Sequence, residues 1–173
     1  MPQSYPDALA VSRRVLRILV YLNWLLGAAV LALLIASLVA EGPVMRGLGV
    51  KPGAGPALFL GMRAIMVVGL LSIPFAHVVL TRLAAIVETV RAGDPFMSEN
   101  ATRLETIAWV VLGMELLHFA VGAIAASVST ETHPLDIDWN FSVTRWLAVL
   151  LCFVLARVFE RGTRMREELE GTV

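Results

Sequence analysis

The feature that most constrains this chain is a long apolar stretch with an acidic residue near its middle. Residues 107–128 read IAWVVLGMELLHFAVGAIAASV, with Glu115 close to the centre and His118 one helical turn further on. A helix needs about 20 apolar residues to cross a bilayer, so this stretch predicts a membrane span. A carboxylate at that depth costs about 3 kcal/mol or more unless it is paired or faces water. We therefore expect other helices to surround it.

Three further apolar runs occupy residues 15–40, 57–80 and 141–159. Hydrophobic residues make up 58% of the chain, above the roughly 45–50% of soluble domains. The first run is too long for the apolar core of a secretory signal, which has about 7–15 residues, so we expect it to be retained. The sequence thus predicts an all-α fold: an integral membrane four-helix bundle forming a single domain over residues 1–173.

The positive charges predict the orientation of this bundle. Of the 14 Lys and Arg residues, ten fall on one side: Arg13, Arg14, Arg17, Arg82, Arg91, Arg103, Arg157, Arg161, Arg164 and Arg166. The other side has Arg46, Lys51, Arg63 and Arg145. Basic residues in short loops favour the cytoplasm, so both termini are expected inside the cell.

The helices of the second and fourth predicted spans, residues 57–80 and 141–159, are expected to extend beyond the membrane into the cytoplasm. An apolar stripe at helical spacing continues from the second span through residues 81–91, and Gly93 is a plausible helix terminator. Asp94-Pro95 then forces a turn, and Ser98 or Asn100 is expected to cap the third helix. The cytoplasmic turn covers residues 81–105, and a charged helical tail covers 160–173.

Two smaller features complete the helical plan. Five glycines and three prolines among residues 41–56 predict an external loop without a regular element. This loop lacks the spacing and the terminal Lys-Ser/Thr of a phosphate-binding loop. Asn23, inside the first span, is expected to make a hydrogen bond to another helix.

The intramembrane polar residues form the first candidate site. Its members are Glu115, His118, Arg63 and Arg145. In the simpler interpretation an arginine pairs with Glu115 and pins the helices, or the arginines extend outward to water. In the functional interpretation the group responds to protons or to a ligand, because protonation of Glu115 or His118 would bias helix packing.

No cofactor and no metal are expected. The weak metal candidates Glu131, His133, Asp136 and Asp138 match no known ligand spacing, and a hydrated acidic loop explains them. Haem ligation by His77 and His118 fits poorly, since the helical rise separates their depths by about 10 Å. The sequence has no serine–histidine–acid triad and no HExxH motif, and we expect no catalytic residues and no enzyme activity.

The residues that follow the second span resemble a known family. The turn consists of Gly93, Asp94, Pro95 and Phe96, and it is followed by Glu99, Asn100, Arg103 and Leu104. Together with the tail LARVFERGTRMREELEGTV, this pattern is similar to the bacterial four-span membrane proteins known as domain of unknown function 2975. The resemblance implies a bacterial inner-membrane protein without established activity, often encoded beside a small helix-turn-helix regulator.

The function expected from these features is that of a non-enzymatic sensor or regulatory partner. The projecting helices offer a docking surface for a cytoplasmic helix-turn-helix regulator, with Gly93, Asp94, Pro95, Phe96, Glu99, Asn100 and Arg103 as the expected contact residues. Attraction of the tail arginines to anionic lipid heads is the simpler interpretation of that surface. The alternative function is a small transporter or channel, as a monomer or a homo-oligomer, using Glu115 and His118. The bilayer is a partner in either case, and no direct nucleic acid binding is expected.

Overall fold

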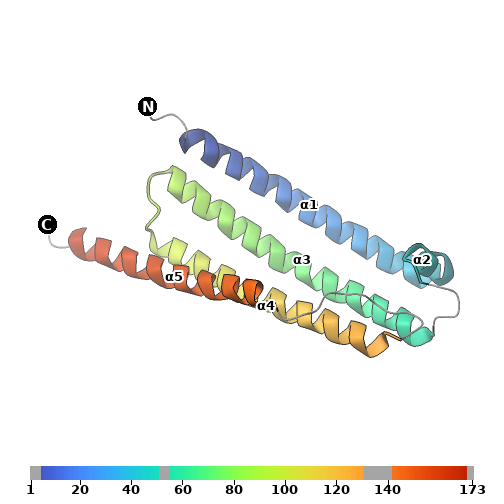
Figure 1. Ribbon diagram of the computed structural model, residues 1–173. Helices are drawn as coiled ribbons and strands as arrows, with labels where there is room; N and C mark the ends of the chain where they lie inside the picture. The colour runs from blue at the N-terminus through green and yellow to red at the C-terminus, as the bar shows by residue number, and fades with distance from the viewer. Residues whose placement is uncertain (1–4, 51–54, 131–141, 171–173) are drawn as a thin grey trace. The chain divides into compact units, whose positions relative to one another are not determined.

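All the elements that the structure describes are α-helices. The computed structural model describes residues 5–50, 55–130 and 142–170. The helices are α1 (Tyr5–Val39), α2 (Glu41–Gly47), α3 (Pro56–Arg91), α4 (Ser98–Val128) and α5 (Val143–Glu170), as labelled in Figure 1. The predicted all-α class is confirmed.

Three of these helices are long and apolar enough to cross a membrane: Ala10–Val39 of α1, all of α3 and all of α4. At 1.5 Å per residue, the 31 residues of α4 extend about 46 Å, well beyond a hydrocarbon core of about 30 Å. Their apolar side chains are mostly exposed, since no more than 22% of the most apolar window is buried in any of the three. Apolar surface on this scale requires lipid, and the chain is a multi-pass membrane protein.

Helix α5 is not among the candidate spans in the described residues. Its apolar first half is interrupted by Arg145 near its start, and Arg157 and Glu160 follow within the next turns. Ser142 precedes the helix, and its Oγ accepts a hydrogen bond from the backbone N–H of Arg145 (3.4 Å), as at a capped helix start. The fourth span therefore stays a prediction.

The prediction that residues 41–56 lack a regular element is wrong for their first part. Helix α2 occupies Glu41–Gly47, and its Met45 is buried. Pro43 lies in the first turn, where a helix has no use for the missing N–H group and where the fixed φ of proline is suited to the helix. Glu41, also in the first turn, is favourable near the positive end of the helix dipole.

The continuation of the second predicted span as a helix is confirmed, while its position in the cytoplasm stays a prediction. Helix α3 runs without interruption from the apolar segment through to Arg91, with Pro74 inside it. Figure 1 shows α3 as one continuous ribbon up to the turn that leads into α4. The apolar stripe through residues 81–91 thus continues the same helix.

The chain forms two compact units, and α1, α3 and α4 contribute a segment to each. Unit 1 contains residues 1–22, 75–113 and 142–173, and unit 2 contains residues 23–74 and 114–141. In unit 2, Gly61 of α3 lies so close to α4 that a Cβ there would be 2.6 Å from a methyl group of Val128. Close approach at small residues is the usual way for membrane helices to pack.

The predicted helix-to-helix hydrogen bond of Asn23 is confirmed, also within unit 2. Its Nδ2 donates to the backbone carbonyl of Ile73 at 3.0 Å. Ile73 immediately precedes Pro74, and its side chain is buried. An amide inside a span thus satisfies its polarity on the backbone of a neighbouring helix.

Candidate functional site

The turn between α3 and α4 begins with a glycine that ends α3. Gly93 has a positive φ of 86°, which side chains other than glycine rarely adopt. Its N–H donates to the carbonyl of Val90, and the N–H of Asp94 donates to the carbonyl of Thr89, both at 3.1 Å. This is the bonding pattern of a Schellman motif, and it confirms the predicted role of Gly93 as terminator.

Asn100 joins the two helices on either side of this turn. Its side chain is completely buried. The Nδ2 group donates to Thr89 Oγ1 (2.7 Å) and to the Pro95 carbonyl (2.9 Å), while Oδ1 accepts a hydrogen bond from Arg103 (2.7 Å). Both amide protons are used, so Asn100 connects the end of α3, the turn and the first turn of α4.

The role that the sequence suggested for Asn100 therefore needs correction in two respects. It lies inside α4, which begins at Ser98, and so it is not the cap of that helix. It is also fully buried, so it cannot touch a partner directly. Three of the other predicted contact residues, Gly93, Phe96 and Glu99, are exposed.

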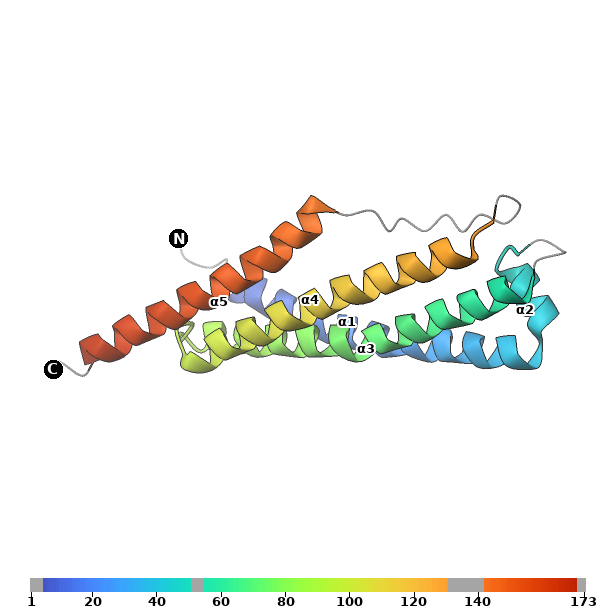
Figure 2. The ribbon, with the colours of Figure 1, turned by 90° about the horizontal axis from the view of Figure 1, so that it is seen from below.

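The turn also rests on α5 (Figure 2). The rings of Phe96 and Phe159 are 5.5 Å apart, and Asp94 forms an ion pair with Arg166. Beneath Phe96 lies Gly162, where a Cβ would be 3.2 Å from the ring. The turn and the tail, which together carry the family resemblance, thus contact each other within one chain.

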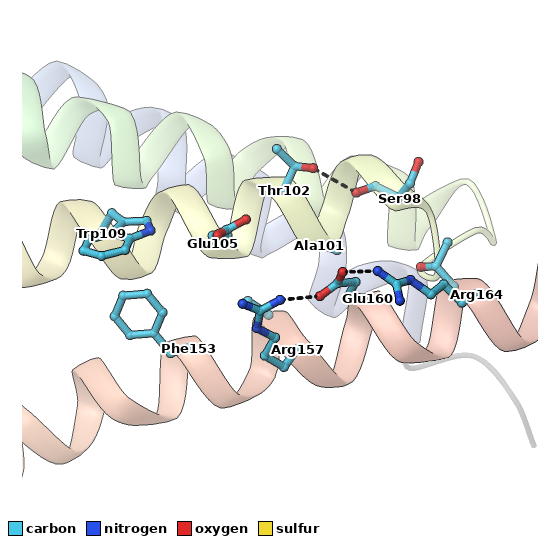
Figure 3. A pocket seen from close by; sticks show the side chains of 11 residues that line it. Ser98, Ala101, Thr102, Glu105, Trp109, Phe153, Arg157, Glu160 and Arg164 are labelled. Carbon is cyan, nitrogen blue, oxygen red and sulfur yellow. Dashed lines mark hydrogen bonds and ion pairs between the residues drawn. The ribbon is translucent and has the colours of Figure 1, made fainter.

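Beside this turn, α4 and α5 enclose a cleft of about 510 Å³ (Figure 3). Its residues come from the first turns of α4 and from the middle of α5: Ser98, Ala101, Thr102, Glu105 and Trp109, and Phe153, Ala156, Arg157, Glu160, Thr163 and Arg164. Trp109 and Phe153 meet edge to face with ring centroids 5.2 Å apart. The cleft therefore has an aromatic end and a charged rim.

Glu160 is the centre of the charged rim. It accepts hydrogen bonds from Arg157 (2.9 Å) and Arg164 (2.6 Å), shown as dashed lines in Figure 3. The hydrogen bond from Arg157 and the positive charge of Arg164 hold the pKa of the Glu160 carboxyl below its usual value. Both arginines keep most of their surface in solvent, with side chains 75% and 69% exposed.

The cleft was not among the sites expected from the sequence. The i, i+3 and i, i+4 spacing of Arg157, Glu160 and Arg164 was available as a signal of ion pairs along one helix face. No local pattern links Trp109 with Phe153, because their contact depends on how α4 packs against α5.

Among the intramembrane candidates, Arg63 has partners other than Glu115. In unit 2, Arg63 of α3 pairs with Glu41 at 2.6 Å and donates to the Ser37 carbonyl (2.5 Å) and to Ser37 Oγ (3.3 Å). The Ser37 carbonyl is one of the last four of α1, which lack partners within their own helix. Arg63 thus binds the end of α1 and the start of α2, and it is not the partner of Glu115.

Glu115 and His118 lie one turn apart on α4, and both are partly buried. Among the residues that the structure describes, His118 Nε2 is a buried atom without a hydrogen-bond partner. Arg145 belongs to the other unit. The weak metal candidates Glu131, His133, Asp136 and Asp138 lie outside the described residues.

Comparison with known proteins identifies one family. A family model described as "Protein of unknown function (DUF2975)" matches residues 62–173, which include α4, α5, most of α3 and the turn. No curated protein and no solved structure matches the chain.

Proposed function

The chain belongs to the DUF2975 family of proteins of unknown function, and from that premise we propose that it is a non-enzymatic sensor or regulatory partner in the bacterial inner membrane. Its partner in this proposal is a cytoplasmic helix-turn-helix regulator. The excess of arginine at the turn and the tail supports a cytoplasmic position for both, with the two termini inside and α5 as a fourth span.

The observation that carries the proposal is the cleft between α4 and α5. Arginine and aromatic residues are the types most enriched where proteins bind one another, and the cleft combines Trp109 and Phe153 with exposed Arg157 and Arg164. A helix with an apolar residue facing the aromatic pair and an acidic residue facing the arginines would complement it.

The α3–α4 turn, which contacts α5, connects the cleft to the membrane helices. Phe96 and Asp94 hold α5 close to the turn, and Asn100 fixes the turn to α3 and α4. A change in helix packing within the membrane would therefore reach the cleft walls directly. This connection supports a sensor in which the membrane helices bias how well the cleft accepts the regulator.

Filling the cleft tests the proposal. Thr102 lines the cleft, and within the described residues its hydroxyl bonds only the Ser98 carbonyl of its own helix, so Thr102→Arg should keep the fold and block the site. The matched control is Thr106→Arg, one turn away, where the hydroxyl makes the same kind of bond to Thr102 and does not line the cleft.

The readout is co-purification of the full chain with the regulator encoded beside it. We expect the Thr102→Arg protein to retain at least about tenfold less regulator than the control, as for a central interface residue. Loosening the turn with Asp94→Asn and Phe96→Ala should also weaken retention. Equal retention by all variants would reject the proposal.

His118 supports the second candidate function, a small transporter or channel, acting alone or as a homo-oligomer. A buried ring nitrogen without a hydrogen-bond partner in the described part of a candidate span is costly, and such residues often mark ion or proton paths. The test is pH-dependent flux into liposomes, compared between the parent protein and Glu115→Gln. Flux that is absent, or that the substitution leaves unchanged, would remove this candidate.

A further inference from the structure

A second, shallower groove lies on α5 itself. Its walls are Phe153, Val154, Arg157, Val158 and Arg161, and its volume is about 310 Å³. Successive positions are one or three residues apart, so that pairs four residues apart repeat along the helix and form one face of it. The groove shares Phe153 and Arg157 with the cleft but opens beside it.

The groove ends in arginine side chains with unused hydrogen-bond donors. Arg161 is exposed and makes no hydrogen bond or ion pair with any residue that the structure describes. Arg157 donates to Glu160 through one nitrogen only and is 75% exposed. A guanidinium carries five N–H donors, and its geometry matches a phosphate, so this pair offers an anion site.

An apolar stripe leads away from these arginines along α5. Val154 and Val158 are 48% and 54% exposed, and Leu147 and Leu150 continue the stripe at 59% and 58%. From Leu147 to Val158 the helix rises about 16 Å, close to half of a 30 Å hydrocarbon core. A single acyl chain in one leaflet spans the same depth.

We propose that this groove binds an anionic phospholipid, with the phosphate on Arg157 and Arg161 and one acyl chain along the stripe. The stripe distinguishes a lipid from a free phosphate, which would need only the arginines. The proposal requires α5 to lie against the bilayer, as in the proposed function. The groove shares Phe153 and Arg157 with the cleft, but its test needs no regulator. It converts a diffuse attraction of the tail to anionic lipid heads into one defined site.

The test titrates the full-length protein, purified in a neutral detergent, with phosphatidylglycerol, phosphatidylcholine of the same acyl chains, and inorganic phosphate. Bound lipid is counted by native mass spectrometry, which gives a Kd for each. We expect phosphatidylglycerol to bind at least about tenfold more tightly than phosphatidylcholine. Arg161→Gln and Arg157→Gln should each raise the Kd for phosphatidylglycerol about fivefold, as expected for one arginine near an anionic headgroup.

The matched control is Arg82→Gln, which removes another exposed arginine of unit 1 that has no partner in the described residues. Arg82→Gln should leave the Kd for phosphatidylglycerol unchanged. Val154→Asn should raise that Kd, because it places a polar side chain in the apolar stripe. Because Arg161 is exposed and makes no hydrogen bond or ion pair with the described residues, Arg161→Gln should keep the fold, and unfolding of each variant in the same detergent checks this. Equal weakening by Arg82→Gln and Arg161→Gln, no effect of Arg161→Gln, or displacement of the lipid by equimolar inorganic phosphate would each overturn the proposal.

Discussion

The α3–α4 turn and the cluster around Arg63 both fasten the end of a helix to a neighbour, but they use different kinds of polar group. The turn uses Asn100, a neutral amide that is completely buried with both its N–H donors bonded. The cluster uses a charged arginine that keeps 21% of its side chain exposed beside Glu41.

This difference follows from the energetics of burial. A neutral amide can be buried fully once its hydrogen bonds are made, whereas burial of a charge remains costly even when it is paired. We therefore expect Asn100 to contribute stability that is insensitive to ionic conditions, and Arg63 to depend on its counter-charge. The following substitutions separate the two, from the largest expected effect to the smallest.

Asn100→Leu should have the largest effect. The substitution leaves Thr89 Oγ1, the Pro95 carbonyl and Arg103 without their bonds to the amide, at a cost of about 3 kcal/mol in the free energy of unfolding. The measurement is unfolding by SDS in mixed micelles. The exposed neighbour is the control, since Glu99→Gln should change the free energy by less than about 0.5 kcal/mol. A loss below about 1 kcal/mol would show that the buried amide does not hold the turn.

Arg63→Gln should cost about 2 kcal/mol, because hydrogen bonds to a charged group are worth more than neutral ones. In a double-mutant cycle with Glu41→Gln we expect a coupling of about 1 kcal/mol between the two side chains. Arg46→Gln serves as the control, since among the described residues the Arg46 side chain bonds only the Gly42 carbonyl of its own helix. A coupling of zero would mean that Arg63 is held by the end of α1 alone.

Gly162→Ala tests the packing of the turn on α5. A methyl group there must displace the Phe96 ring, and this should offset the gain of about 1 kcal/mol that alanine brings to a helix. In a Phe96→Ala background the obstacle is gone, so the same substitution should stabilise the protein by about 1 kcal/mol. Equal effects in the two backgrounds, measured by unfolding in micelles, would contradict the contact.

The smallest effect concerns pH at the cleft. The pKa of Glu160 is lowered in the folded protein, so its ion pairs stabilise the fold above the ordinary pKa of glutamate. That contribution disappears as the pH falls through the lowered pKa of the folded state. Glu160→Gln should therefore be slightly less stable than the parent at pH 7 and equal to it in strong acid, by thermal unfolding. A difference that persists in acid would have another origin.

Several features could be predicted from the sequence because their cause is local. The spacing of apolar residues predicts the long helices, and Gly93 predicts where α3 ends, since few other residues adopt its backbone conformation. Helix α2 was missed because the prediction rested on the number of glycines and prolines in residues 41–56 and not on where they lie in a helix. Pro43 is harmless in a first turn.

The candidate site depended on contacts between distant residues. The sequence marked the turn as a motif, but only the packing of α5 revealed that Phe96 and Asp94 bind the chain's own tail. Likewise, charge alone left Arg63 free to meet Glu115, and its true partners became clear once α2 was placed at the end of α1.

The sequence by itself determined that this protein lives in lipid and where its long helices run, because hydrophobicity and backbone preference act along the chain. Only the tertiary structure decided which polar groups form hydrogen bonds with one another. A hydrogen bond requires donor and acceptor to be placed to within a few tenths of an ångström, and no residue pattern encodes such placement between distant segments.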